Sequence, residues 1–480
     1  MGERTIFQTI GFYLGPLLAS IILMSDAPTG LSTNAWQVVA LGSWMAIWWG
    51  SEAIPIPITS LLPLVLLPLL GVGTLKEAAI PYASPIIFLL LGGFIIAMAL
   101  QRWNLHKRIA LNILVVFGQR PTMIIAGFMA ATAFLSMWIS NTATTLMMIP
   151  IALSVAETIV GPDNPRNPFI IALLLAIAYS ASIGGMGTII GTPPNLMMVG
   201  YLRETLNIEI SFVQWMAFGV PVVMVLIPTA WFVLTKLYFK LDDNNYNQAG
   251  VVVKEELAKL GSITVPERRT AITFIIIALA WIFRLQLNKI SGLENLSDTE
   301  IAIIGAIAMF LIYSGSSEKK GSFLLNWDWA VRIPWGVLLL FGGGLSLAAA
   351  VSASGLAIWL GESLSIFTEL HLFILLLALI TMIVFLTELT SNTATTATLL
   401  PVLGAIAIAG NIDPMLLAAP AAIAASCAFM LPVATAPNAI VFSGGRVHIP
   451  DMAGAGFRLN ILAIIILTVL CYSLIPIIFT

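Results

Sequence analysis

A six-residue polar sequence, Ser-Asn-Thr-Ala-Thr-Thr, occurs twice in this chain, at residues 140–145 and again at residues 391–396. The offset of 251 residues between the two copies also places Pro150 on Pro401. A long constant offset between matched sequences indicates that the chain consists of two duplicated halves. Both copies interrupt strongly apolar stretches, and a polar motif repeated in two hydrophobic halves is typical of secondary transporters.

The composition is that of a membrane protein. Of the 480 residues, 59% are hydrophobic and 9% are charged, and the mean hydropathy is +1.01, whereas soluble domains carry about 25% charged residues. Backbone polar groups must be satisfied internally in lipid, so an all-α polytopic fold is predicted. Eleven spans of about 20 residues are predicted, at residues 8–24, 35–51, 55–72, 85–101, 168–200, 212–235, 270–288, 299–315, 333–351, 414–443 and 457–478.

Two details of this assignment follow from local sequence. Residues 8–24 lack a small-residue cleavage site, which favours a first membrane span over a signal peptide. Cys427 and Cys471 both lie in apolar segments. Buried free thiols are therefore expected at these two positions rather than a disulfide.

The two hexapeptides lie at the centres of residues 121–160 and 371–410, each between predicted spans. Neither segment is long enough to cross a bilayer twice comfortably with a polar break in its middle. Both are interpreted as re-entrant hairpins whose tips lie at membrane depth, which is tolerated where the tips line a cavity. Two ordinary tilted spans joined by a polar turn remain the alternative.

The remaining segments define the domain organisation. Residues 1–34 form an extra N-terminal span, residues 35–240 the first repeat, and residues 270–480 the second. The polar residues 241–269 are interpreted as the linker between the repeats. Residues 102–118 are basic and amphipathic, which suits a helix lying in the membrane interface.

The Lys and Arg residues predict the orientation. With the N-terminus in the cytoplasm, 17 of the 21 Lys and Arg residues are cytoplasmic, and only Lys76, Arg203, Arg284 and Lys289 are outside. Each repeat contains five predicted spans, an odd number, so the repeats have inverted topology. The hairpins then enter from opposite sides, and their tips meet near the midplane.

A second shared motif, Thr-x-Pro-Asn, interrupts the span that follows each hairpin. It occurs at residues 192–195, within the broken helix 168–200, and at residues 435–438, within the broken helix 414–443. Pro and Gly at these places free backbone carbonyl and amide groups at membrane depth. Ordinary proline kinks would also explain either motif taken alone.

The electrostatics of a hairpin tip suit an ion pair. The helix that ends at a tip points carbonyl groups toward it, and the helix that begins there points N–H groups toward it. Hydroxyl, amide and carbonyl oxygens suit Na⁺, although Ser, Asn and Thr are also common N-caps. No Lys, Arg or His occurs in residues 121–165 or 372–445, so a bound anion is expected to find no side-chain cation near the tips. These features predict cation-coupled anion transport.

Glu388 follows Thr387 and has Met137 as its counterpart, so it is either a proton or cation site or a structural hydrogen-bonding group.

Functional classes other than transport have less support. An enzyme would need a nucleophile–base pair or metal ligands, but no H-E-x-x-H sequence is present, and His106, His371 and His448 lie at predicted membrane edges. A channel is disfavoured by tips that occlude the path.

At both Ser-Asn-Thr tips and both Thr-x-Pro-Asn breaks, the sequence resembles the divalent anion–sodium symporter family over nearly its whole length. The resemblance implies a scaffold domain that dimerises, a transport domain that moves as an elevator, and sodium bound beside each tip. It implies one sodium site at Ser136, Ser140, Asn141 and Gly191 and another at Thr387, Thr390, Asn392 and Ala434. It implies substrate contacts from Ser140, Asn141, Thr142, Thr192, Ser391, Asn392, Thr393 and Thr435.

The resulting expectation is Na⁺-coupled symport of C4-dicarboxylates such as succinate by a homodimer in a bacterial plasma membrane, with no enzymatic activity and no nucleic-acid partner. A di- or tricarboxylate exchanger and a sulfate transporter of the same family remain alternatives. Ala436 departs from a family pattern with proline at this place, which questions the backbone shape near Thr435.

Overall fold

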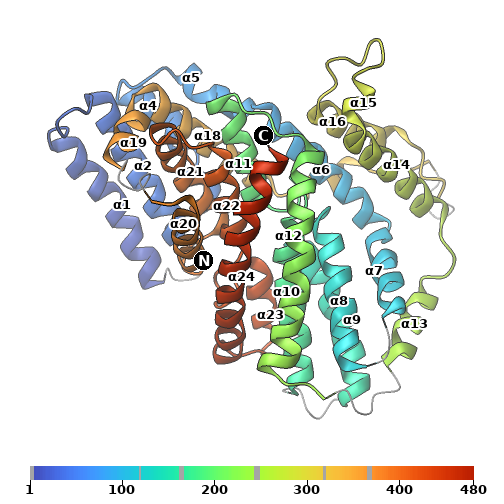
Figure 1. Cartoon of the computed structure of the whole chain (residues 1–480). Helices are drawn as coiled ribbons and strands as arrows, with labels where there is room; N and C mark the ends of the chain where they lie inside the picture. Colours follow the sequence, from blue (N-terminus) through green and yellow to red (C-terminus); the bar gives the residue numbers. More distant parts are fainter. Residues whose placement is uncertain are drawn as a thin grey trace.

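The computed structural model describes residues 5–117, 120–161, 167–242, 249–316, 321–364 and 370–479, and it is built from helices (Figure 1). Within these ranges the only β pairing is an isolated bridge between Tyr313 and Phe323. Eight helical stretches of the described chain are long and apolar enough to cross a membrane, and four shorter apolar helices accompany them. An all-helical polytopic membrane protein is thus confirmed.

The first half of the chain carries twelve α-helices before its linker, within the described residues. They are α1 (Ile6–Met24), α2 (Thr33–Ser51), α3 (Ile56–Thr59), α4 (Leu62–Leu69), α5 (Leu75–Ala79), α6 (Pro85–Arg102), α7 (Leu105–Val116), α8 (Pro121–Ser136), α9 (Asn141–Val160), α10 (Pro168–Gly185), α11 (Pro193–Leu206) and α12 (Phe212–Phe232). A 3₁₀ turn, η1 (Ile80–Ala83), precedes α6, and a π-helical segment, η2 (Val233–Tyr238), extends α12.

The linker and the second half repeat much of this order. They contain α13 (Ala249–Lys259), α14 (Val265–Ile282), α15 (Arg284–Leu287), α16 (Asp298–Leu311), α17 (Trp327–Ala330), α18 (Trp335–Ala353), α19 (Leu356–Ser363), α20 (Leu372–Thr387), α21 (Asn392–Ala409), α22 (Met415–Ala425), α23 (Ala436–Ser443) and α24 (Ile449–Ile478). In α14 the helix begins within the range predicted as linker, because Thr264 caps it with a capping box.

The two repeated motifs coincide with chain reversals and helix breaks. Each Ser-Asn-Thr sequence lies at the turn of a helix pair, α8 with α9 and α20 with α21. Each Thr-x-Pro-Asn sequence begins the second half of a broken helix, at α11 after α10 and at α23 after α22. Pro193 and Pro437 lie in the first turns of those second halves, where a missing backbone N–H is tolerated.

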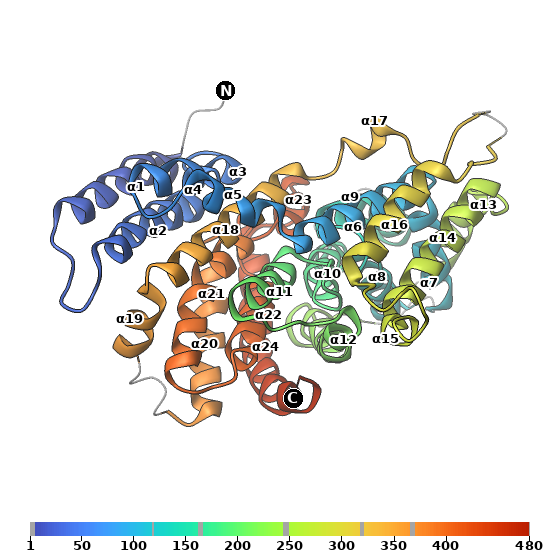
Figure 2. The ribbon, with the colours of Figure 1, turned by 90° about the horizontal axis from the view of Figure 1, so that it is seen from above.

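The broken helices occupy the interior of the molecule (Figures 1 and 2). Every residue of α10 from Phe169 to Gly185 is buried, and α10 packs against both α8 and α9. Likewise α22 is buried except at the half-buried Leu416, and it packs against α20, α21 and α24. A helix without an exposed face is held by its neighbours on every side, so these two helices fix the positions of the hairpins.

The first helix has the opposite character. It presents buried residues only at Gly11, Gly15 and Ala19, a narrow stripe that faces α2. A side chain at Gly15 would come within 2.8 Å of the indole of Trp48, so the two helices approach closely there. Small residues at a helix contact are typical of packing in a bilayer, where the remaining apolar surface faces lipid. Figure 2 shows α1 and α2 together at one end of the molecule, with α14 at the other.

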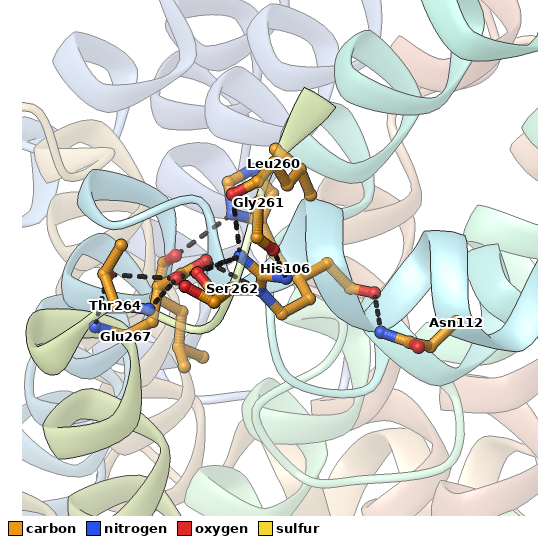
Figure 3. Close-up of polar contacts among 9 residues, drawn as sticks. His106, Asn112, Leu260, Gly261, Ser262, Thr264 and Glu267 are labelled. Carbon is orange, nitrogen blue, oxygen red and sulfur yellow. Dashed lines mark hydrogen bonds and ion pairs between the residues drawn. The ribbon is translucent and has the colours of Figure 1, made fainter. Parts of the chain in front are cut away.

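A network of polar contacts joins α7 to the linker (Figure 3). Arg108 donates to the carboxylate of Glu267 at 3.0 and 3.1 Å, and to the carbonyl groups of Leu260, Gly261 and Ser262 at 3.2, 2.9 and 3.3 Å. The side chains of Arg108 and Glu267 are only 12% and 5% exposed. A planar guanidinium with five donors is the side chain that can hold a carboxylate and several carbonyls at once.

We expect Arg108→Met to lower the free energy of unfolding by about 3 kcal/mol, because removing one partner of a buried ion pair leaves the other uncompensated. Thermal unfolding of the purified protein measures the loss, and limited proteolysis should cut the linker faster. Lys107→Met is the matched control, since its ion pair with Glu256 is more exposed, at 32% and 17%. Equal losses in the two variants would contradict a specific role for Arg108.

Candidate functional site

One cavity of about 530 Å³ lies between the two tips, residues 140–142 and 391–393. The two helix breaks, α6, and the chain from α17 to the start of α18 complete its walls. All eight residues that the resemblance assigned to substrate line this cavity: Ser140, Asn141, Thr142, Thr192, Ser391, Asn392, Thr393 and Thr435. The structure therefore brings together residues that lie far apart in sequence, up to 295 positions for Ser140 and Thr435 (435 − 140).

Four helices begin at the cavity in the described chain. They are α9 and α21, which start at the tips, and α11 and α23, which start at the breaks; their N-cap residues are Ser140, Ser391, Thr192 and Thr435. The first N–H groups of a helix have no partner within it, and the helix dipole makes this end positive. Four such dipole ends around one cavity favour an anion there, although Pro193, Pro194 and Pro437 carry no backbone N–H to donate.

Beside the first tip, four oxygen atoms face one another. The Asn141 side-chain oxygen lies 2.6 Å from the hydroxyl of Ser136, 3.1 Å from the carbonyl of Ala181 and 3.2 Å from the carbonyl of Gly191. Ser136 donates to the Ala181 carbonyl at 2.6 Å and is fully buried. One hydroxyl proton cannot satisfy so many acceptors. Either a cation lies among these oxygens, or the Asn141 amide turns over and the two protons of its NH₂ group face the three acceptors.

The second tip repeats this arrangement. Thr387, fully buried, donates to the Asn392 side-chain oxygen at 2.8 Å and to the carbonyl of Ala425 at 2.9 Å. A hydroxyl, an amide oxygen and a carbonyl from the end of a broken helix are thus grouped at both tips. Hard cations take oxygen ligands of these kinds, and unwound carbonyls at helix ends hold Na⁺ in transporters. The residues fit the expected cation at both places.

Not every predicted ligand joins these two clusters by its side chain. The Ser140 hydroxyl accepts from the N–H of Ala143 at 3.4 Å, which is an N-cap contact. The Thr390 hydroxyl contacts the carbonyl of Leu386 at 3.0 Å and the hydroxyl of Thr395 at 2.6 Å. Gly191 and Ala434 line the cavity. Missing from the sequence prediction were the carbonyl groups of Ala181 and Ala425.

The asparagine of each Thr-x-Pro-Asn motif holds the unwound segment before it. Asn195 donates to the carbonyls of Gly185, Met186 and Thr188 at 3.2, 3.2 and 2.8 Å. Asn438 donates to the carbonyls of Ala428 and Leu431, both at 3.0 Å. Both asparagines are fully buried. Each NH₂ group thereby satisfies carbonyls that the helix break has freed, which fixes the loops beside the oxygen clusters.

The contacts of Glu388 are those expected for the second of its two predicted roles, that of a hydrogen-bonding group. Its carboxylate accepts from the backbone N–H groups of Phe429, Met430 and Leu431 at 2.7 to 3.1 Å, and from the Asn460 amide at 2.7 Å. The side chain is 3% exposed and does not line the cavity. These hydrogen bonds connect the end of α20 to the backbone of the second break.

One sequence inference needs correction. The absence of Lys, Arg and His from both hairpins led to the prediction that no side-chain cation lies near the tips. Arg332, from the segment between α17 and α18, lines the same cavity. Arg332 lies outside residues 121–165 and 372–445, and the fold brings its segment to the cavity. None of the three histidines lines the cavity.

The departure at Ala436 does not alter the backbone before it. Thr435 has φ −141° and ψ 151°, close to the φ −143° and ψ 142° of its counterpart Thr192. Both residues are extended and both precede a helix.

The two free thiols, Cys427 and Cys471, are buried, as predicted. In the described chain no group of three His, Cys, Asp or Glu side chains could hold a metal ion.

The chain is similar to known transporters over nearly its whole length. Residues 12–479 match the family model described as the sodium:sulfate symporter transmembrane region. The chain is 43% identical over 476 residues to the sodium-dependent dicarboxylate transporter SdcS of Staphylococcus saprophyticus, covering 98% of this chain and 92% of that protein. It is 42% identical over 478 residues to SdcS of Staphylococcus aureus, with the same coverage of 98% and 92%.

A likeness of fold extends to a more distant protein. The crystal structure of the Alcanivorax borkumensis YdaH transporter matches with a TM-score of 0.62, over 99% of each chain, at 13% sequence identity. At this identity the match concerns the fold alone. It identifies the arrangement of helices here as one that a known transporter also adopts.

Proposed function

The chain belongs to the divalent anion–sodium symporter family, a family of transporters, and from this premise we propose that it carries C4-dicarboxylates such as succinate together with Na⁺. The observation that carries the proposal is the shared cavity, where four helix N-termini adjoin two oxygen clusters. The relatives named as sodium-dependent dicarboxylate transporters support it, at 42% and 43% identity.

Each tip is proposed to hold one carboxylate. At the first tip the donors are the N–H groups at the start of α9 and the hydroxyls of Ser140 and Thr142. At the second tip they are the N–H groups at the start of α21 and the hydroxyls of Ser391 and Thr393. Thr192 and Thr435 add hydroxyls from the breaks. A ligand with two carboxylates can engage both tips at once, whereas a monocarboxylate engages one.

Sodium is the second transported species in this proposal. Asn141 and Asn392 each belong to an oxygen cluster and also line the cavity. An amide can present its oxygen to a cation and its NH₂ group to a carboxylate at the same time. Bound Na⁺ would therefore orient each amide for the anion and offset its negative charge, which couples the two binding events.

The membrane arrangement is also part of the proposal. It comprises eleven spans, two re-entrant hairpins and inverted repeats, with the N-terminus in the cytoplasm. The first arm of each hairpin, α8 in one and α20 in the other, has 16 residues. A helix of this length spans about 24 Å, which is less than a hydrocarbon core of about 30 Å. We further propose a scaffold domain that forms a homodimer and a transport domain, carrying the hairpins, that moves as an elevator.

Uptake of labelled succinate into proteoliposomes tests the function. We expect an inward Na⁺ gradient to raise the initial rate at least tenfold over K⁺ or choline at the same pH, because the oxygen clusters must be filled before the anion is stabilised. Lactate and acetate should compete far less well than succinate, since each engages one tip. Full uptake without Na⁺ would contradict symport.

The same assay separates the alternatives within the family. An exchanger would need dicarboxylate or tricarboxylate inside the liposomes and would ignore the Na⁺ gradient. A sulfate transporter would accumulate labelled sulfate in preference to succinate. A cavity of about 530 Å³ leaves room for an anion larger than succinate, so citrate belongs among the competitors tested.

A further inference from the structure

We infer that Arg332 is a specificity-determining residue, which attracts doubly charged substrate from the wall of the cavity that the tips also line. The inference deepens the proposed function and rests on it. Among the lining residues that the structure describes, Arg332 is the only one with a charged side chain. Any formal charge that a dicarboxylate meets on a protein side chain of this cavity is therefore the guanidinium of Arg332.

The position of Arg332 is fixed by its neighbours. Its guanidinium carbon lies 4.3 Å from the ring centroid of Trp329, a cation–π contact. Trp329 and Pro334 line the cavity on either side of it in sequence. Arg332 itself is exposed, so the charge stays hydrated and free to meet an anion that enters.

A second donor lies on the same wall. Gln101, from the last turn of α6, lines the cavity, and its side-chain nitrogen is buried without a hydrogen-bond partner. The short helix α17, just before Arg332, packs against α6. Amide and guanidinium groups can only donate through their nitrogen atoms. Arg332 and Gln101 therefore offer donors to an anion in the cavity, in addition to the neutral groups of the tips.

The charge of the substrate decides the size of the effect. The attraction of Arg332 for a dianion is twice that for a monoanion at the same distance, and it weakens with salt because the site is hydrated. A cavity with charge of one sign raises the local concentration of its counter-ion and the rate of association. Arg332 should thus lower KM for dicarboxylates while leaving the later movement of the loaded carrier unchanged.

The test uses the full-length protein in proteoliposomes under a fixed Na⁺ gradient. We expect Arg332→Gln to raise KM for succinate about five- to tenfold at low ionic strength, with the maximal rate within about twofold of wild type. Arg332→Lys keeps the charge and should stay close to wild type. The difference between Arg332→Gln and wild type should shrink as choline chloride is added. Arg268→Gln, an exposed residue of α14 outside the cavity lining, is the control.

Inhibition of succinate uptake by monomethyl succinate, a monoanion of similar shape, distinguishes an electrostatic role of Arg332 from a purely structural one. Its inhibition constant should change less than KM for succinate in Arg332→Gln. Gln101→Leu should raise KM without altering the salt dependence. The inference is overturned if Arg332→Gln and Arg268→Gln have the same KM, or if both ligands are affected equally. Wild-type protein that needs no Na⁺ would instead overturn the proposed function.

Discussion

Aspartate in place of Asn141 or Asn392 is expected to abolish Na⁺-driven uptake while the protein still folds and inserts. Aspartate keeps the size and the oxygen ligand of asparagine but loses its NH₂ donor. It also places a negative charge beside an anion site. The Asn141 side-chain atom that faces Ser136, Ala181 and Gly191 lies 2.6 to 3.2 Å from their three oxygens. A carboxylate has an oxygen there in either orientation, so it is tolerated only next to a cation. Sodium could still bind, but the dianion would be repelled.

Two measurements on purified, monodisperse variants check this expectation. Binding of Na⁺ and of succinate is measured separately, and uptake is measured under the same gradient as for wild type. Ser140→Ala and Ser391→Ala are the matched controls, since each removes one hydroxyl and should weaken binding by only about 0.5–1.5 kcal/mol. If both aspartate variants transport succinate like wild type, the tips are helix caps and the substrate binds elsewhere.

The motifs were predictable from the sequence because their chemistry resides in side chains. A polar hexapeptide in an apolar stretch must either line a cavity or turn the chain, and the structure shows that it does both at residues 140–145 and 391–396. Proline and glycine at the breaks disrupt helix hydrogen bonds, so the interruption of both broken helices was also foreseeable. Helix ends were less exact: α24 begins at Ile449, eight residues before the predicted span, because Pro450 and Asp451 suit a first turn.

Two parts of the site left no signal in the sequence. The carbonyl groups of Ala181 and Ala425 contribute oxygen atoms that every residue possesses, so only the path of the backbone reveals them. Arg332 is a surface arginine like many others until the fold places its segment against the cavity. Ligands supplied by the backbone or by distant segments depend on tertiary structure, and a single sequence does not record their position.

The two repeats differ beside their tips, where Glu388 stands opposite Met137 at the 251-residue offset. In the first repeat the carbonyl of Met137 accepts from the hydroxyl of Thr188 at 2.5 Å, which ties the tip to the break. In the second repeat the Glu388 carboxylate performs this task by binding three successive N–H groups of the break. The same connection between hairpin and broken helix is thus made by different groups.

We therefore expect Glu388→Gln to lower the free energy of unfolding by about 3 kcal/mol or more, since one carboxylate oxygen becomes an NH₂ group that faces N–H donors in a buried site. Glu388→Met should be worse, because the N–H groups of Phe429, Met430 and Leu431 would lose their acceptor altogether.

Thermal unfolding and uptake between pH 6 and 8 distinguish this structural role from proton transport. A structural Glu388 predicts that Glu388→Gln loses stability and uptake together, with the pH profile of any residual uptake unchanged. Asn460→Leu is the control, because it removes one donor to Glu388 and leaves the three backbone contacts in place. A stable Glu388→Gln protein that transports with an altered pH profile would instead show that this carboxyl group exchanges protons during the cycle.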